Sequence, residues 1–173
     1  MLFNRIKLYR SLIKPGITNM QLITVSIGFV LSANGVLHLL FVFVPLLLGT
    51  WLTSAGACAL NHAVEISVDK KMNRTQSRPL PSGQLTRLEV LLFGCLCVGS
   101  GLFIHFYWTT VLTTLLSALT VFFYVGIYTP LKRYSWLNTW VGAIPGAMPI
   151  LGGWAAVVGV LQVEAAPLFL VLF

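Results

Sequence analysis

Long apolar stretches, separated by short polar connections, set the pattern of the chain. Six of them stand out: Ile17–Val36, Leu39–Leu60, Val90–Tyr107, Thr109–Tyr128, Thr139–Val160 and Pro167–Phe173. A helix needs roughly 20 apolar residues to cross the hydrocarbon core of a bilayer, and the first five stretches meet that length within the error of their boundaries. The sixth has seven residues before the chain ends and is too short to span. The pattern therefore predicts an all-α integral membrane protein, a multi-span helical bundle of about five complete spans plus the start of a sixth.

The composition supports the membrane assignment and excludes other classes of protein. Of the 173 residues, 57% are hydrophobic and only 9% are charged. In soluble domains about 25% are charged. So few charges cannot cover the surface of a cytosolic globule, and so apolar a chain is neither disordered nor a secreted disulfide scaffold. The three cysteines, Cys58, Cys95 and Cys97, fall within predicted spans and are interpreted as buried small apolar residues.

The basic residues alternate between the two sides of the predicted bundle. Four precede the first span, and the five connections that follow hold none, five, none, two and none. They are Arg5, Lys7, Arg10 and Lys14, then Lys70, Lys71, Arg74, Arg78 and Arg87, and finally Lys132 and Arg133. Because cytoplasmic connections are rich in Lys and Arg, the N-terminus and the second and fourth connections are predicted to be cytoplasmic. We therefore expect a multi-pass protein of a bacterial inner membrane, with the lipid bilayer and no nucleic acid as partner.

The chain divides into two regions. Residues 1–16 mix four cations with apolar side chains and lack the cleavage site of a signal peptide. They predict a short amphipathic helix that lies on the cytoplasmic leaflet. Lys14-Pro15-Gly16 is expected to end that helix and to turn the chain into the first span. Residues 17–173 then form the transmembrane domain.

The polar stretch after the second span carries the candidate chemistry. Asn61, Glu65 and Asp69 are spaced four apart, so a helix that continues through them places them within about 80° on one face. Two carboxylates and an amide suit Mg²⁺, which keeps water and phosphate oxygens in its shell. Five cations follow within twenty residues, and arginine binds phosphate oxygens bidentately. The pattern predicts a Mg²⁺-diphosphate site at the cytoplasmic surface; spacing alone is equally compatible with a solvated flank that fixes topology.

The same stretch carries a family resemblance. It reads Asn61-x₃-Glu65-x₃-Asp69-x₂-Met72-x-Arg74-Thr75-x₂-Arg78-Pro79-Leu80-Pro81-x-Gly83. This resembles the first acidic motif of the UbiA-type intramembrane prenyltransferase superfamily, which includes the ubiquinone, menaquinone and chlorophyll prenyltransferases. Within that superfamily, the stretches Tyr128–Thr139 and Val141–Trp154 are similar to segments of the protohaem IX farnesyltransferases (haem O synthases). The stretch Lys14-Pro15-x-Ile17-Thr18 before the first span is similar to that family as well. The resemblance covers the chain from about residue 12 to its end.

The resemblance implies a fold, an activity and a set of site residues. The fold is a bundle of about nine spanning helices around a central cavity. The activity is transfer of a farnesyl group from farnesyl diphosphate to a vinyl group of haem B, giving haem O for haem A synthesis. Asn61, Glu65 and Asp69 match the positions that bind Mg²⁺-diphosphate, although Glu65 stands where several branches have Asp. The basic positions expected near the diphosphate are Arg74, Arg78, Lys132 and Arg133.

The chain departs from the family pattern at its C-terminal end. The superfamily has a second acidic motif near the inner end of the sixth span, and this chain stops before it. We therefore expect a prenyltransferase domain truncated at the C-terminus and inactive by itself, with no haem-binding residue assigned. A complex with a downstream haem-modifying enzyme is a further expectation. Two alternatives stay open: a prenyltransferase for a quinone or chlorophyll precursor, and a non-catalytic truncated membrane protein.

Histidines and aromatic residues add weaker candidates. His62, beside the acidic motif, is interpreted as a polar interfacial side chain rather than a haem ligand, and His38 and His105 as interfacial residues of the opposite side. The rings of Phe122–Tyr124 are candidates to stabilise an allylic cation, with packing as the simpler interpretation. The small residues of the fifth span predict close packing between helices; they are Gly142, Gly146, Gly152 and Gly153.

Overall fold

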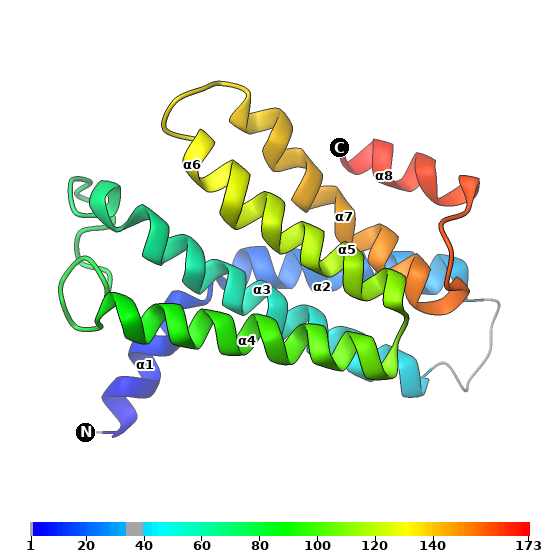
Figure 1. Ribbon diagram of the computed structural model, residues 1–173, viewed down its shortest axis with the longest axis horizontal. Helices are drawn as coiled ribbons and strands as arrows, with labels where there is room; N and C mark the ends of the chain where they lie inside the picture. The colour runs from blue at the N-terminus through cyan, green and yellow to red at the C-terminus, as the bar shows by residue number, and fades with distance from the viewer. Residues whose placement is uncertain (1, 34–39) are drawn as a thin grey trace.

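The computed structural model describes residues 2–33 and 40–173, and this part of the chain is a helical bundle without strands (Figure 1). Its elements are α1 (Leu2–Leu12), α2 (Pro15–Ser32), α3 (Leu40–Asp69), α4 (Arg87–Trp108), α5 (Val111–Val121), the π-helix η2 (Phe122–Tyr128), α6 (Thr129–Leu131), α7 (Asn138–Val158), the short 3₁₀ helix η3 (Val163–Ala165) and α8 (Ala166–Leu172). Five helices in the described part are long and apolar enough to span, which confirms the multi-span prediction. The predicted first connection, with His38, lies outside the described residues.

The helix boundaries differ from the predicted spans where local chemistry starts or stops a helix. α2 ends at Ser32, four residues before the predicted end of the first span, and it begins at Pro15, since proline is well suited to a first helical turn. α3 continues without interruption for 30 residues to Asp69, so the acidic motif lies on the same helix as the second span, as predicted. The predicted fourth span starts later than expected, at Val111, because the side chain of Thr110 caps α5.

Glycines let the helices approach closely, and α2 lies against α7 as a result. A Cβ atom on Gly28 would overlap the carbonyl oxygen of Ile150, and one on Gly153 would overlap the carbonyl oxygen of Val25. The predicted packing role is confirmed for Gly142, whose Cβ would lie 2.8 Å from the Tyr128 ring, and for Gly153. No atom from outside the surrounding helical backbone lies within 4 Å of the Cβ position of Gly146 or Gly152. Small residues at contacts of this kind drive helix association in a bilayer.

The pairing of α3 with α4 explains two wrong predictions. His105 is fully buried rather than interfacial, because Gly49 on α3 leaves room for its imidazole; a Cβ on Gly49 would lie 2.7 Å from that ring. The face of α4 that carries Gly94 and His105 packs on α3, so the side chain of Cys95 is exposed and not buried.

The N-terminal helix α1 is present as predicted, but protein rather than lipid covers its last turn. Leu12 is buried with Ala63 and Leu85 at the end of the α3–α4 pair. The ring of Tyr9 lies 5.1 Å from that of Phe93. α1 is therefore held against the same end of the bundle as the acidic motif (Figure 1).

Candidate functional site

The acidic motif forms one buried row at the end of α3. Asn61, Glu65 and Asp69 are only 2%, 8% and 4% exposed. Each side chain meets one cation from a different segment. Lys14 Nζ donates to Asn61 Oδ1 at 2.6 Å, and Lys132 Nζ donates to Glu65 Oε1 at 3.2 Å. Arg78 Nη1 lies 3.1 and 3.0 Å from the two carboxylate oxygens of Asp69. The described structure thus brings three oxygen-bearing side chains and three cations into one small site.

The connection from α3 to α4 folds back onto the helix that it leaves. The hydroxyl of Thr75 donates to the backbone carbonyl of Asp69 at 3.0 Å, which satisfies one of the free carbonyls at the helix end. Leu80 and Leu85 are buried against α3, and Gly83 takes the left-handed conformation with φ of 78° that the turn requires. These contacts return Arg78 to the Asp69 carboxylate.

The predicted diphosphate-binding cations do not all reach this row. Lys132 and Arg78 contact the carboxylates directly. Arg133 instead donates from Nη2 to the backbone carbonyl of Val64 at 2.7 Å, so it fastens the α6–α7 connection to α3. Arg74 is exposed, and within the described residues it makes no hydrogen bond to the acidic row.

Lys14 is the site residue that sequence reasoning left out of the candidate set. It stands immediately before α2, and burial is the main cause that lowers the pKa of its ammonium from the ordinary value of 10.5. The nearby Glu65 carboxylate acts in the opposite direction, and Arg78 adds to the lowering. The available signal was a lysine directly before the proline that opens the first span.

His62 is buried, so its interpretation as an interfacial side chain is wrong. It lies on the turn of α3 that packs against the bundle, next to Asn61. Its Nδ1 is 3.6 Å from Asp69 Oδ2, which is too long for a hydrogen bond. Neither ring nitrogen has a hydrogen-bond partner among the described residues.

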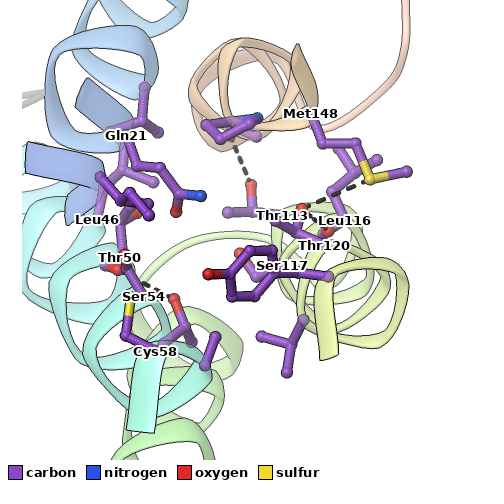
Figure 2. Close-up of a pocket in the computed structure, with 18 residues that line it drawn as sticks. Gln21, Leu46, Thr50, Ser54, Cys58, Thr113, Leu116, Ser117, Thr120 and Met148 are labelled. Carbon is purple, nitrogen blue, oxygen red and sulfur yellow. Dashed lines mark hydrogen bonds between the residues drawn. The ribbon is translucent and has the colours of Figure 1, made fainter. Parts of the chain in front are cut away.

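A cavity inside the bundle lies next to the acidic row. Figure 2 shows side chains from α2, α3, α5 and α7 around it. Cys58, on its wall, is three residues before Asn61, about 4.5 Å along the helix axis. Ser54 and Thr113 use their hydroxyls to donate to Thr18 Oγ1 and to the carbonyl of Gly152. Apolar side chains such as Leu46 and Leu116 share the wall with the polar side chains of Gln21, Thr50 and Ser117, so the lining is mixed.

Only one of the three candidate aromatic rings lines this cavity. Tyr124 does so, whereas Phe122 is 57% exposed on the outside of the bundle and Phe123 is half-buried away from the cavity. The ring of Tyr124 stacks on that of Tyr128, with centroids 5.7 Å apart.

The comparisons with known proteins identify the family. The model of the UbiA prenyltransferase family matches residues 21–173. The chain belongs to this family. It is 35% identical over 169 residues to a protoheme IX farnesyltransferase of Francisella tularensis subsp. novicida, covering 96% of this chain and 60% of that protein. It is 37% identical over 153 residues to the protoheme IX farnesyltransferase of Baumannia cicadellinicola, covering 88% of this chain and 53% of that one.

A solved structure shows the same fold. A digeranylgeranylglyceryl phosphate synthase in membranes superposes with a TM-score of 0.82, at 21% sequence identity, over 98% of this chain and 58% of that chain. The resemblance seen in the motifs is therefore confirmed at the level of the UbiA family. The chain spans about 60% of the length of the first of these relatives.

The donor set of this UbiA chain fits a divalent cation only in part. Within residues 2–33 and 40–173, no group of three or more His, Cys, Asp or Glu side chains converges as a ready metal centre. The row nevertheless offers two carboxylates and the Asn61 amide oxygen on one face. Mg²⁺ is commonly held by one or two carboxylates together with substrate phosphates. Glu65 and Asp69 could hold such an ion with substrate phosphates, although each carboxylate is paired with a cation in this structure, Lys132 and Arg78 respectively.

Proposed function

We propose that this chain carries a diphosphate-binding part of a protohaem IX farnesyltransferase, which transfers a farnesyl group from farnesyl diphosphate to haem B. The observation that carries the proposal is the meeting of the Asn61–Asp69 row with three cations, next to a cavity inside the bundle. Relatives that are protoheme IX farnesyltransferases, such as those of Francisella tularensis subsp. novicida and Baumannia cicadellinicola, favour haem over a quinone or chlorophyll precursor as the acceptor.

The residues of the row would act on the leaving group. The allylic C–O bond breaks with its electron pair leaving on the diphosphate, and the vinyl π-electrons of haem B form the new C–C bond. The cation left on the acceptor is neutralised by water with loss of a proton. Lys14, Arg78 and Lys132 stabilise the charge that develops on the diphosphate. Mg²⁺, when bound at Glu65 and Asp69, neutralises the phosphate oxygens.

In this proposal the cavity binds the prenyl chain, and the charged end of the bundle binds the diphosphate. The apolar part of the cavity wall, which includes Leu46 and Leu116, receives the prenyl chain and keeps water away from the allylic cation. The basic segments lie at one end of the bundle (Figure 1). This arrangement supports a cytoplasmic N-terminus in a bacterial inner membrane, since positive connections stay inside.

The activity is tested on membranes that contain the complete gene product. Supplied with haem B and farnesyl diphosphate, they are expected to form haem O, which mass spectrometry detects. Asp69→Asn is expected to abolish the product, whereas the exposed neighbour Lys70 provides the matched control Lys70→Ala. Prenylation of 4-hydroxybenzoate without formation of haem O would overturn the haem assignment.

The 173-residue chain alone is a second test of the site. We expect it to bind Mg²⁺-diphosphate without catalysing transfer, because the described residues offer only two carboxylates for the metal. Full turnover by this chain would show that the two carboxylates suffice.

A further inference from the structure

We infer that Thr129 is a positioning residue, which fixes the atom of the Asn61 amide that faces the diphosphate; the inference rests on the proposed function. Thr129 is 0% exposed and is the first residue of α6. Its Oγ1 lies 2.9 Å from Nδ2 of Asn61, across 68 positions of sequence. Lys14 contacts the other polar atom of the same amide, Oδ1.

The π-helix η2 sets the place of this hydroxyl. The backbone carbonyl of Tyr124 lies five residues before Thr129 and accepts the backbone N–H of Thr129. The same carbonyl lies 2.7 Å from Thr129 Oγ1. A π-helical turn is rare and occurs frequently at functional sites. Here it presents one carbonyl to both donors of Thr129.

Counting protons then fixes the direction of each hydrogen bond. A threonine hydroxyl has a single proton, and a carbonyl oxygen can only accept. The Thr129 proton is therefore committed to Tyr124, and Oγ1 offers only lone pairs to Asn61. Asn61 must turn its NH₂ group to Thr129, so its Oδ1 points the other way.

Lys14 independently requires the same orientation. Its ammonium can only donate, and it lies 2.6 Å from Asn61 Oδ1. The amide is thus held between an acceptor on one side and a donor on the other. Without the Thr129 hydroxyl, Lys14 would be the one remaining partner that holds this orientation, and any rotation of the amide would turn its NH₂ toward the cations. An oxygen in this position can bind Mg²⁺ or accept from Lys14, whereas an NH₂ group can do neither.

The test measures binding of inorganic diphosphate in the presence of Mg²⁺, by calorimetry on the complete protein in lipid nanodiscs. Mutation of a group that orients a metal ligand typically lowers the affinity for the metal about tenfold to a hundredfold. We expect Thr129→Val to weaken binding by that factor and Thr129→Ser to bind as the wild type does. Thr114→Val is the matched control, since Thr114 uses its hydroxyl within its own helix, on the carbonyl of Thr110.

A double-mutant cycle separates positioning from a general effect on folding. In the Asn61→Ala background, Thr129→Val is expected to cause no further loss of affinity, because the amide that it orients is gone. Thermal unfolding of each variant checks the fold. If Thr129→Val does not fold, Thr129→Ala removes the hydroxyl without placing a methyl group against the Tyr124 carbonyl, and it carries the same expectation.

Each outcome decides between named alternatives. Wild-type protein that does not bind Mg²⁺-diphosphate contradicts the proposed function itself. If the wild type binds and Thr129→Val binds equally well, the positioning role is overturned. It is also overturned if Thr129→Ser is as weak as Thr129→Val, or if the loss is the same in the Asn61→Ala background.

Discussion

Removing Arg78 is expected to destabilise the protein more than removing the charge of its partner. The side chain of Asp69 is 5% exposed, while that of Arg78 is 26% exposed. Arg78→Met leaves a buried carboxylate without its cation, whereas Asp69→Asn leaves a guanidinium that water can reach. Breaking a fully buried pair by removing one partner costs about 3–5 kcal/mol. With the exposure of Arg78 taken into account, we expect a loss of about 2–3 kcal/mol.

The assay is thermal unfolding in detergent followed by circular dichroism. For a chain of this size, the expected loss corresponds to a fall in Tm of about 5–10 °C. Asp69→Asn is expected to lower Tm by less, and the double variant Arg78→Met/Asp69→Asn to recover part of the loss, since no buried charge then remains unpaired. Arg74→Met is the control, because Arg74 is exposed and, among the described residues, makes no hydrogen bond to the acidic row.

The same variant also tests the metal proposal. If Asp69 binds Mg²⁺, Arg78 and the metal compete for one carboxylate. Mg²⁺ alone should therefore raise the Tm of Arg78→Met more than that of the wild type, since a ligand stabilises the state to which it binds. Equal effects of Arg74→Met and Arg78→Met on Tm, or equal Mg²⁺ shifts in wild type and Arg78→Met, would refute the reasoning.

Three further predictions follow from particular contacts. Burial lowers the pKa of Lys14 below 10.5. Between the lowered pKa and 10.5, the unfolded chain binds more protons than the folded protein, so the free energy of unfolding rises with pH. In this pH range, the Tm of the wild type should rise with pH, and the Tm of Lys14→Met should change less. Gly153→Ala should lower the free energy of unfolding by about 1–3 kcal/mol, because its Cβ meets the Val25 carbonyl, whereas Gly146→Ala, in open space, should leave Tm unchanged. Lys132→Met should weaken calorimetric binding of Mg²⁺-diphosphate, with the exposed Lys71→Met as control and equal affinities as the contradicting result.

The sequence predicted the features that depend on local spacing. Five spans follow from runs of apolar residues, and the row of Asn61, Glu65 and Asp69 follows from their spacing of four on one continuous helix. The partners of that row did not follow, because Lys14 and Thr129 meet Asn61 from 47 and 68 positions away. No spacing rule encodes such contacts between helices.

Burial was equally hard to predict where it depends on a neighbouring helix. His105 appeared interfacial from its place near the end of a span, and only the facing Gly49 explains why it is buried. The π-helical turn before Thr129 was not predicted either, because nothing in the sequence of Phe122–Tyr128 distinguishes it from an ordinary α-helical segment.

The three cations that contact the acidic row of α3 also give the row an order of assembly. In a chain that enters the bilayer from its N-terminal end, Lys14 is already made when Asn61 emerges, and Arg78 reaches Asp69 nine residues later. Lys132, the partner of Glu65, is made only 67 residues after Glu65 itself. Until then the Glu65 carboxylate lacks this cation and must remain hydrated. In a Glu65→Cys variant, ribosome-bound chains arrested before Lys132 should therefore leave the new thiol open to a water-soluble thiol reagent, and longer chains should protect it.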